Sequence, residues 1–132
     1  MRLISDEALA VLTVWQEARN QSFIGKCAVG EVIRNRMHRH YNSDGTVPGT
    51  VCRAWQFSGW NTQDPNRVPS LKLDDNDPMV QECMKAWRTS QATSYARAAV
   101  LYLNKSIVDP LPDWARDDKQ VAVIGAHTFY LD

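Results

Sequence analysis

Apolar residues recur at helical spacing in three segments of the chain. The first segment covers residues 8–18 and follows Ser5, a residue type that caps the N-terminus of helices. The second covers residues 27–37, and the third covers residues 79–87 after Asp77, another capping residue type. The pattern predicts three helices, over residues 6–18, about 25–38 and about 78–88.

The segments around these helices follow weaker patterns. Residues 39–76 are rich in Asn, Ser, Asp, Gly, Thr and Pro, which predicts one long irregular segment of a kind that is usually functional or disordered. Residues 93–100 predict one or two more helical turns. The β-branched run 121–124, a turn at Gly125 and a second strand over 127–131 predict a terminal hairpin. The expected fold is therefore α+β and mainly helical, with a small sheet or hairpin, in a single domain over residues 1–132.

Composition supports a folded chain of one domain. The chain has 132 residues, 44% hydrophobic and 23% charged, which is close to the globular average. Fifteen Lys and Arg balance fifteen Asp and Glu, so nucleic acid is not an expected partner. The basic cluster Arg34, Arg36 and Arg39 is interpreted as a solvated helix face.

The sequence gives little support for a metal site, a disulfide or a membrane-spanning segment. The cysteines, Cys27, Cys52 and Cys83, are odd in number and far apart, so we expect reduced thiols and activity that survives dithiothreitol. His38 and His40 face different sides of a helix, and residues 74–77 lack the glycine and glutamate of a calcium loop. No cofactor or metal is expected. No run of eighteen apolar residues predicts stable membrane insertion, and Asp6 and Glu7 stand where a signal peptide is basic, so we expect storage in a cytoplasm.

Glu17 is the first candidate for chemistry. It lies near the C-terminal end of the first predicted helix, where the helix dipole opposes ionisation, and Trp15 is close enough to desolvate it. Both effects raise the pKa of a carboxyl group, and a carboxyl protonated near neutral pH can donate its proton to a glycosidic oxygen. A solvated helix-end residue is the alternative interpretation.

Four ordered motifs resemble one family, the SleB-type cell-wall hydrolases. Residues 17–19 and 25–36 resemble the signature E-A-R-G-E … G … A-V-A-x-V-I-x-N-R. Residues 56–58 read Q-F-S, residues 98–104 resemble A-L-Y-Y-x-N, and residues 124–130 resemble I-G-x-H-x-F-Y. Two departures stand out: Asn20 and Gln21 replace the Gly-Glu of the family, and residues 61–76 look like an insertion.

The resemblance implies a fold related to lytic transglycosylases and a role in degrading peptidoglycan. The catalytic acid of the family corresponds to Glu17, and the expected partner is the glycan strand, cleaved between N-acetylmuramic acid and N-acetylglucosamine. We expect a monomeric lytic transglycosylase of a bacteriophage, held in the host cytoplasm until release to the cell wall or carried on the virion. A hydrolytic muramidase and a catalytically inactive glycan-binding or virion module are the alternatives. An amidase is disfavoured, because neither a zinc ligand set nor a cysteine nucleophile is visible.

Seven further residues are candidates for substrate binding. Gln56 and Ser58 share one face of an extended segment, with Phe57 in the core, although a simple turn is the competing interpretation. Tyr102 and Asn104 have the same spacing, and Tyr102 could place its hydroxyl beside the developing positive charge. His127 belongs to the terminal motif but could equally be a hairpin residue bonded to backbone.

The remaining candidates are tryptophans. Trp15 and Trp87 lie on helical apolar stripes and are expected in the core, whereas Trp55, Trp60 and Trp114 lie in polar segments. An exposed indole can stack on the apolar face of a pyranose ring. We therefore expect Trp60 and Trp114 to bind the glycan.

No second acidic residue lies in a matching motif, and this shapes the expected mechanism. Glycoside hydrolysis ordinarily uses two carboxylates, whereas a transglycosylase can use a single acid with the 6-hydroxyl of the sugar as internal nucleophile. Hydrolysis would instead require an acidic residue of the 61–77 segment, such as Asp64 or Asp75. We expect Glu17→Gln to abolish activity and leave the melting temperature nearly unchanged.

Overall fold

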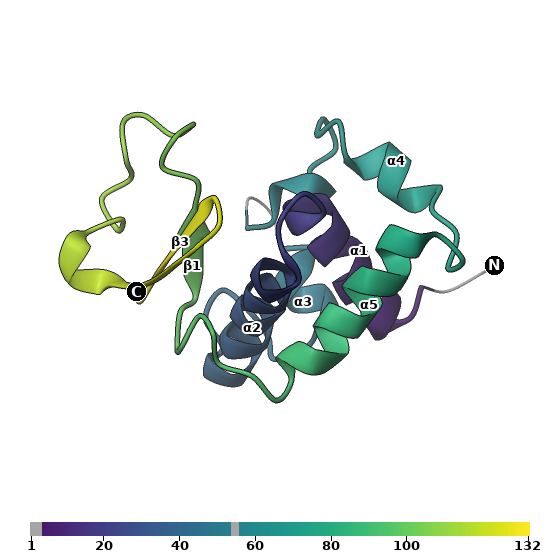
Figure 1. The fold of residues 1–132 in the computed structure, drawn as a ribbon, viewed down its shortest axis with the longest axis horizontal. Helices are drawn as coiled ribbons and strands as arrows, with labels where there is room; N and C mark the ends of the chain where they lie inside the picture. Colours follow the sequence, from purple (N-terminus) through teal and green to yellow (C-terminus); the bar gives the residue numbers. More distant parts are fainter. Residues whose placement is uncertain (1–3, 54–55) are drawn as a thin grey trace.

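The computed structural model describes residues 4–53 and 56–132. Within them the helices are α1 (Asp6–Ala18), α2 (Phe23–Arg39), α3 (Pro48–Val51), α4 (Arg67–Leu71) and α5 (Pro78–Ser90), and the strands are β1 (Leu101–Leu103), β2 (Gln120–Ile124) and β3 (His127–Tyr130). Two short 3₁₀ helices, η1 (Ser58–Trp60) and η2 (Asp117–Lys119), complete the order. The C-terminal residues lie beside the sheet, on the far side of the molecule from α5 (Figure 1).

The molecule has a helical part and a small sheet beside it. Helices α1, α2 and α5 pack together around the largest core cluster, which includes Val14, Ile33 and Trp87. The antiparallel sheet has the strand order β1-β3-β2 and lies on the α2 side of the helices (Figure 1). Helix α2 joins the two parts, because Ala28 and Val32 pack against Phe129 of β3. The fold is α+β and mainly helical, as predicted.

The three long helices form where the sequence predicts them. Helix α1 has the predicted bounds, and the Ser5 hydroxyl accepts a hydrogen bond from the Ala8 N–H. Asp77 caps α5 in the same way, accepting from the Met79 and Val80 N–H groups. Helix α2 starts earlier than predicted because its cap is Ser22, which fixes the first turn before the apolar stripe begins.

Two predictions of local structure were wrong. Residues 39–76 are not a single irregular segment, since α3, η1 and α4 form within them. Residues 93–100 form a turn and no helix, with Arg97 in the left-handed region at φ 54°. The predicted hairpin is confirmed, with β2 and β3 joined through Gly125 at φ 58°, and it gains a third strand, β1, whose three residues are too few for a readable pattern.

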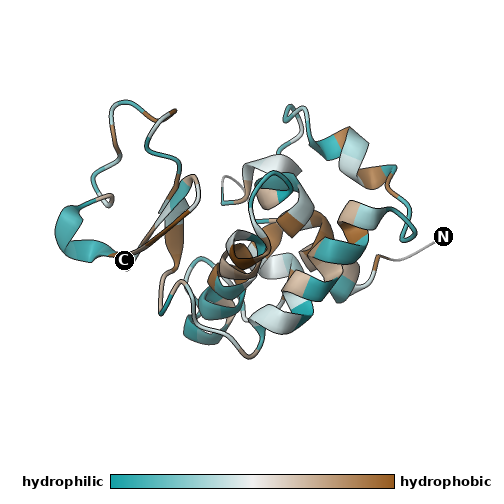
Figure 2. Cartoon of the chain, in the orientation of Figure 1, coloured by the Kyte–Doolittle hydropathy of each residue, from teal (hydrophilic) through white to brown (hydrophobic). Residues whose placement is uncertain are grey.

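The two faces of the sheet contact different groups. Tyr102 and Phe129 are opposite each other and face the helices, whereas Leu101 pairs with Tyr130 on the other face. Apolar residues accordingly gather where the helices pack together and on the strands, while much of the outer loops is hydrophilic (Figure 2). No helix in the described parts of the chain is long and apolar enough to cross a bilayer.

The basic cluster of α2 is only partly a solvated face. Arg39 is exposed and pairs with Asp132 at 2.9 Å, whereas Arg36 is buried and Arg34 donates to the carbonyls of Ser90 and Thr93. Arg34 and Arg36 leave α2 in different directions because positions two apart on a helix do not face each other. The interpretation of one solvated basic patch is therefore corrected for Arg34 and Arg36.

Glu31 is a fully buried carboxyl group that fixes the turn after α5. It accepts a hydrogen bond from the Thr93 hydroxyl at 2.6 Å and from the Ala96 N–H at 2.8 Å. We predict that Glu31→Ala lowers the free energy of unfolding by about 3 kcal/mol, because both donors lose a buried acceptor. Urea denaturation measures the change. Asp118→Ala, which removes only the exposed ion pair with Arg116, should stay within about 0.5 kcal/mol of wild type.

Candidate active site

Glu17 lies at the last turn of α1, beside a polar hollow. The residue is half-buried, and the hollow has a volume of about 200 Å³. Its lining comes from the end of α1, the following connection and one residue of the segment before α4: Gln16, Glu17, Ala18, Arg19, Asn20, Gln21 and Asn66. The predicted acid is therefore accessible from a cavity that offers polar groups on most of its surface.

The pKa of Glu17 is raised from 4.5 to about 7. The largest cause is desolvation, which disfavours the charged carboxylate, and the second is the negative charge of Asp64. A hydrogen bond from Tyr102 and the positive charge of Arg36 act in the opposite direction and lower the pKa. The direction and the desolvation match the expectation from sequence, whereas the effects of Asp64, Tyr102 and Arg36 come from other segments of the chain.

Tyr102 brings a hydroxyl group to the Glu17 carboxyl from β1. Burial raises the pKa of Tyr102 well above its ordinary value, and the neighbouring Glu17 raises it further, so the phenol stays protonated and donates. The ring is held by His127 and Phe129, whose centroids lie 4.9 Å and 5.6 Å away. Among the candidates for substrate binding, Tyr102 is the one that acts on the pKa of Glu17.

Arg36 is a functional candidate that the sequence interpretation assigned to solvent. Its Nε donates to the Val100 carbonyl at 2.7 Å, and its guanidinium lies 4.8 Å from the centre of the Phe57 ring. Burial lowers the pKa of Arg36, while the charges of Tyr102, Tyr41 and Glu17 raise it. Arg36 thus brings a positive charge near Glu17 from α2, the helix that also packs against the sheet.

The hydrogen bonds of Gln56 hold Arg36 in place and, among the described residues, do not reach Glu17. Its Oε1 accepts from Arg36 Nη1 and from Asn42 Nδ2, each at 3.2 Å. Phe57 is buried, as predicted, while Ser58 is exposed at the start of η1. The predicted alternation holds for Phe57, although the 3₁₀ turn at Ser58 ends the extended segment sooner than expected.

Trp60 is not a free aromatic face. Its indole N–H donates to the Thr13 hydroxyl at 2.8 Å, and the half-buried ring packs against the main core cluster. Thr13 lies one helical turn before Glu17 on α1. The core takes one side of the Trp60 ring, and the assignment of Trp60 to glycan binding stays a prediction.

Two other candidates have structural partners away from Glu17. Trp114 packs edge-on against Tyr130 at 5.5 Å, on the sheet face opposite to Tyr102, and its assignment to glycan binding stays a prediction. The Asn104 Oδ1 accepts from the N–H and hydroxyl of Ser106, so that this side chain closes the turn after β1. Trp55 lies outside the described residues.

His127 occupies the aromatic group behind Tyr102. It is buried, and burial lowers its pKa. Its Nδ1 has no hydrogen-bond partner among the described residues. A neutral imidazole in this position fits the support of Tyr102 better than it fits a general base.

Gln21 carries out a structural task at the position where the family signature has glutamate. Its Oε1 accepts from the Ala126 N–H at 3.1 Å, and it lies so close to Gly125 that a side chain there would collide with it. A carboxylate could accept the same bond, so the neutral amide keeps the contact. Gln21 thereby fastens the β2–β3 turn to the edge of the hollow.

Arg19 and Asn66 also shape the hollow, and neither was a candidate from sequence. Arg19 stacks on Trp15 at 4.1 Å and donates to Asn66 Oδ1 at 2.7 Å. The Asn66 N–H in turn donates to Asp64 at 2.8 Å. The only signal in the sequence was the E-A-R motif, which does not say what the arginine binds.

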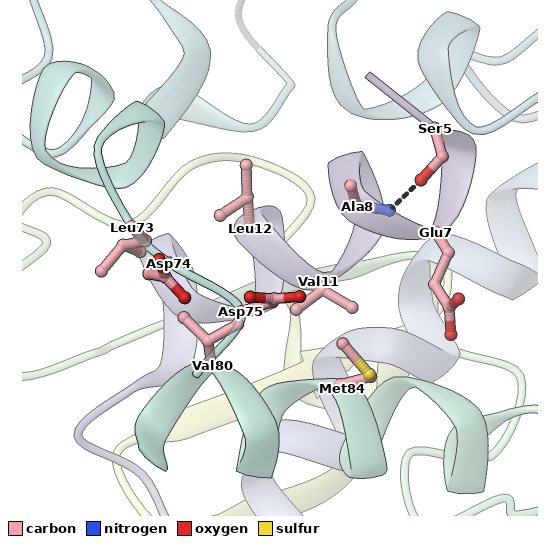
Figure 3. Close-up of a pocket in the computed structure, with 10 residues that line it drawn as sticks. All are labelled: Ser5, Glu7, Ala8, Val11, Leu12, Leu73, Asp74, Asp75, Val80 and Met84. Carbon is pink, nitrogen blue, oxygen red and sulfur yellow. Dashed lines mark hydrogen bonds between the residues drawn. The ribbon is translucent and has the colours of Figure 1, made fainter. Parts of the chain in front are cut away.

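A second hollow of about 210 Å³ lies at the other end of α1 (Figure 3). Its lining includes the apolar side chains of Val11 and Met84, and the carboxylate of Asp75 lies between α1 and α5 (Figure 3). Asp75 therefore lines a different cavity from Glu17. The described residues contain no group of three or more His, Cys, Asp or Glu side chains arranged to hold a metal ion.

Comparison with known proteins identifies similar sequences and folds. The family model described as Cell Wall Hydrolase matches residues 20–130, a range that begins just after Glu17. Two solved structures are similar: the catalytic domain of the germination-specific lytic transglycosylase SleB from Bacillus anthracis and the catalytic domain of the Bacillus cereus SleB protein. Each is 23% identical, covers 95% of this chain and has a TM-score of 0.75, and the matches cover 93% and 88% of those chains. A comparison with curated proteins found no match.

The raised pKa of Glu17 makes stability depend on pH. Unfolding returns the carboxyl to a pKa near 4.5, so the unfolded chain releases a proton that the folded protein keeps until about pH 7. Stability therefore falls as pH rises through that window. We predict that Glu17→Gln, which cannot ionise, is more stable than wild type at about pH 8 by on the order of 2 kcal/mol, and that the gain shrinks toward pH 4.

Denaturation by urea at several pH values measures this effect. Glu7→Gln is the matched control, because a hydrogen bond from Arg88 lowers the pKa of Glu7 and the swap should give no gain at neutral pH. Equal stabilities of wild type and Glu17→Gln across the range would contradict a raised pKa. The expectation of an unchanged melting temperature is thus replaced by a pH-dependent gain.

Proposed function

This chain belongs to the cell wall hydrolase family, and from that premise we propose that it is a lytic transglycosylase acting on the glycan strand of peptidoglycan. The proposed cut lies between N-acetylmuramic acid and N-acetylglucosamine. The observation that carries the proposal is the Glu17 carboxyl, whose pKa of about 7 leaves a large protonated fraction at neutral pH, at a polar hollow. The similarity to solved SleB catalytic domains supports the fold in which such a site is placed.

A single carboxyl group can complete the reaction without water. Glu17 donates its proton to the glycosidic oxygen as the bond from that oxygen to C1 of the muramoyl residue breaks. The 6-hydroxyl of the same sugar then bonds to C1, and its proton returns to the Glu17 carboxylate. The intramolecular attack gains from proximity, because the nucleophile is already held by the bound sugar. The product is a 1,6-anhydro-muramoyl end, and the acid is regenerated.

Tyr102 and Arg36 supply what the second half of this reaction needs. After proton donation Glu17 is an anion, which the hydrogen bond from Tyr102 and the charge of Arg36 stabilise. The same two interactions limit how far the pKa of the acid can rise. We propose that they balance Glu17 between its two roles, as donor first and acceptor afterwards.

Hydrolysis remains the second candidate because of Asp64. Its negative charge raises the pKa of Glu17, so a second carboxylate acts on the acid although the matching motifs contain none. An inactive glycan-binding module is disfavoured by the same electrostatics, since binding alone gives no reason to hold a carboxyl group near neutrality. Product analysis separates all three.

The proposal extends to a biological setting, a bacteriophage lysin that stays in the host cytoplasm until release or travels with the virion. The resemblance to a family that includes phage lysins supports it. Expression in the cytoplasm of a bacterial host should leave the culture turbid until the inner membrane is permeabilised with chloroform, after which turbidity should fall. Lysis that begins on expression alone would contradict dependence on release.

We predict that purified sacculi digested with wild-type protein yield 1,6-anhydro-muramoyl ends and no new reducing ends. Mass spectrometry distinguishes them, because an anhydro end is lighter than a hydrolysed one by one water. Glu17→Gln should lower the rate by about 10²- to 10⁴-fold, as expected for the loss of a general acid. Glu82→Gln is the control of the same chemistry outside the hollow, and it should keep its activity. Products with only reducing ends would replace the transglycosylase by a muramidase.

A further inference from the structure

Three side chains around the hollow beside Glu17 hold hydrogen-bond donors that have no partner among the described residues. Arg19, Gln21 and Asn66 are half-buried and line this hollow together with Glu17. Arg19 Nη2 donates to Asn66 Oδ1 at 2.7 Å, so two of the three side chains contact each other directly. The hollow, of about 200 Å³, has room for a ligand group of several atoms.

The two amides are fixed with their oxygen atoms bonded to other groups. Gln21 Oε1 accepts from the Ala126 backbone N–H at 3.1 Å, and Asn66 Oδ1 accepts from Arg19. Both partners can only donate, so neither amide can exchange its oxygen and nitrogen without losing its bond. Gln21 Nε2 and Asn66 Nδ2 have no acceptor in the described parts of the chain. Both amides therefore offer N–H groups to a ligand.

Arg19 adds a positive charge to these donors. Its guanidinium lies over the Trp15 ring at 4.1 Å, and Nη1 donates to the carbonyls of Trp15 and Gln16. These contacts hold the side chain in place and leave its Nε–H without an acceptor among the described residues. Of the described residues that line the hollow, Glu17 is the one with a carboxyl group, and it keeps its proton until about pH 7. While Glu17 is protonated, an anionic ligand group meets a guanidinium and no negative charge in the lining.

The neutral Gln21 is the residue that gives the hollow this character. The family signature has glutamate at this position. A glutamate could accept the bond from the Ala126 N–H with one oxygen, but its second oxygen would then stand where the Gln21 amide has its N–H groups. That oxygen would accept hydrogen bonds and repel an anion, whereas the amide donates. The departure from the signature therefore adds a donor to the hollow and removes a negative charge.

We propose that Arg19, Gln21 and Asn66 bind the carboxylate of the lactyl group that distinguishes N-acetylmuramic acid from N-acetylglucosamine. Three donating side chains, one of them charged, match a carboxylate, whose two oxygens only accept. This inference rests on the proposed function, in which C1 of the muramoyl residue reacts beside Glu17, since the lactyl group belongs to the same sugar. The carboxylate is free only where the amide bond to the stem peptide has been hydrolysed, so the favoured strand has lost its peptides.

The test compares two soluble glycan strands. In the first, an amidase has removed the stem peptides and left free lactyl carboxylates. In the second, carbodiimide and ammonia have converted these carboxylates to primary amides of similar shape. We expect wild-type protein to cleave the first strand with a kcat/KM roughly tenfold higher, through a lower KM, because the second strand has lost the charge-assisted hydrogen bonds. Equal values for the two strands would overturn the inference.

Gln21→Glu tests the site itself, because it restores the residue of the family signature and keeps an acceptor for the Ala126 N–H. We expect kcat/KM to fall about tenfold on the carboxylate strand and to stay within about twofold of wild type on the amidated strand. Gln63→Glu is the matched control, since it adds the same charge at an exposed residue outside the lining and should change neither value. Equal losses of Gln21→Glu on both strands would assign Gln21 to the fold alone and would also overturn the inference.

Binding separates this inference from the proposed function. Calorimetry with Glu17→Gln measures affinity without cleavage, and we expect the carboxylate strand to bind roughly tenfold more tightly than the amidated one. Equal affinities of an inactive Glu17→Gln for the two strands would contradict the carboxylate site and leave the proposed function standing. Cleavage of both strands by Glu17→Gln would instead contradict the proposed function, whatever the two affinities are.

Discussion

The Glu17 carboxyl group is half-buried at the end of α1, and the residues packed around it must accommodate it in both its protonated and its charged form. Desolvation of Glu17 disfavours its charge, and the surrounding groups do not remove this penalty, because no ion pair to Glu17 forms among the described residues. The residue is therefore destabilising in its charged form at neutral pH. Keeping such a group lowers the stability of the folded protein at neutral pH. The same group holds its proton near pH 7, which is what proton donation to a leaving group requires.

Helix α2 makes this arrangement possible because it serves both parts of the molecule. Ala28 and Val32 of α2 pack against Phe129 of β3. This packing places Tyr102 of the neighbouring strand β1 near Glu17. Arg36 of α2 brings its positive charge to the site, and its Nε donates a hydrogen bond to the Val100 carbonyl, immediately before β1. The hydroxyl and the guanidinium that stabilise the Glu17 anion are thus set by one helix and the strand packed on it.

The opposing charge comes from a separate source. Asp64 belongs to a segment that departs from the family pattern, and its negative charge raises the pKa of Glu17. In this chain the balance is a pKa of about 7 for Glu17.

The sequence by itself determined the long helices, the hairpin and the family, and it singled out Glu17 as the candidate acid, because caps, apolar stripes and ordered motifs are local or tolerate intervening change. It could not determine the neighbours of Glu17. Arg36 looked like a surface residue until helix packing buried it, and only the sheet placed Trp114 on the face opposite to Tyr102. Strand β1 has three residues and gains its identity only by pairing with β3. The pKa of Glu17 was decided by the tertiary structure, since burial, Asp64, Tyr102 and Arg36 act through space from segments far apart in the chain.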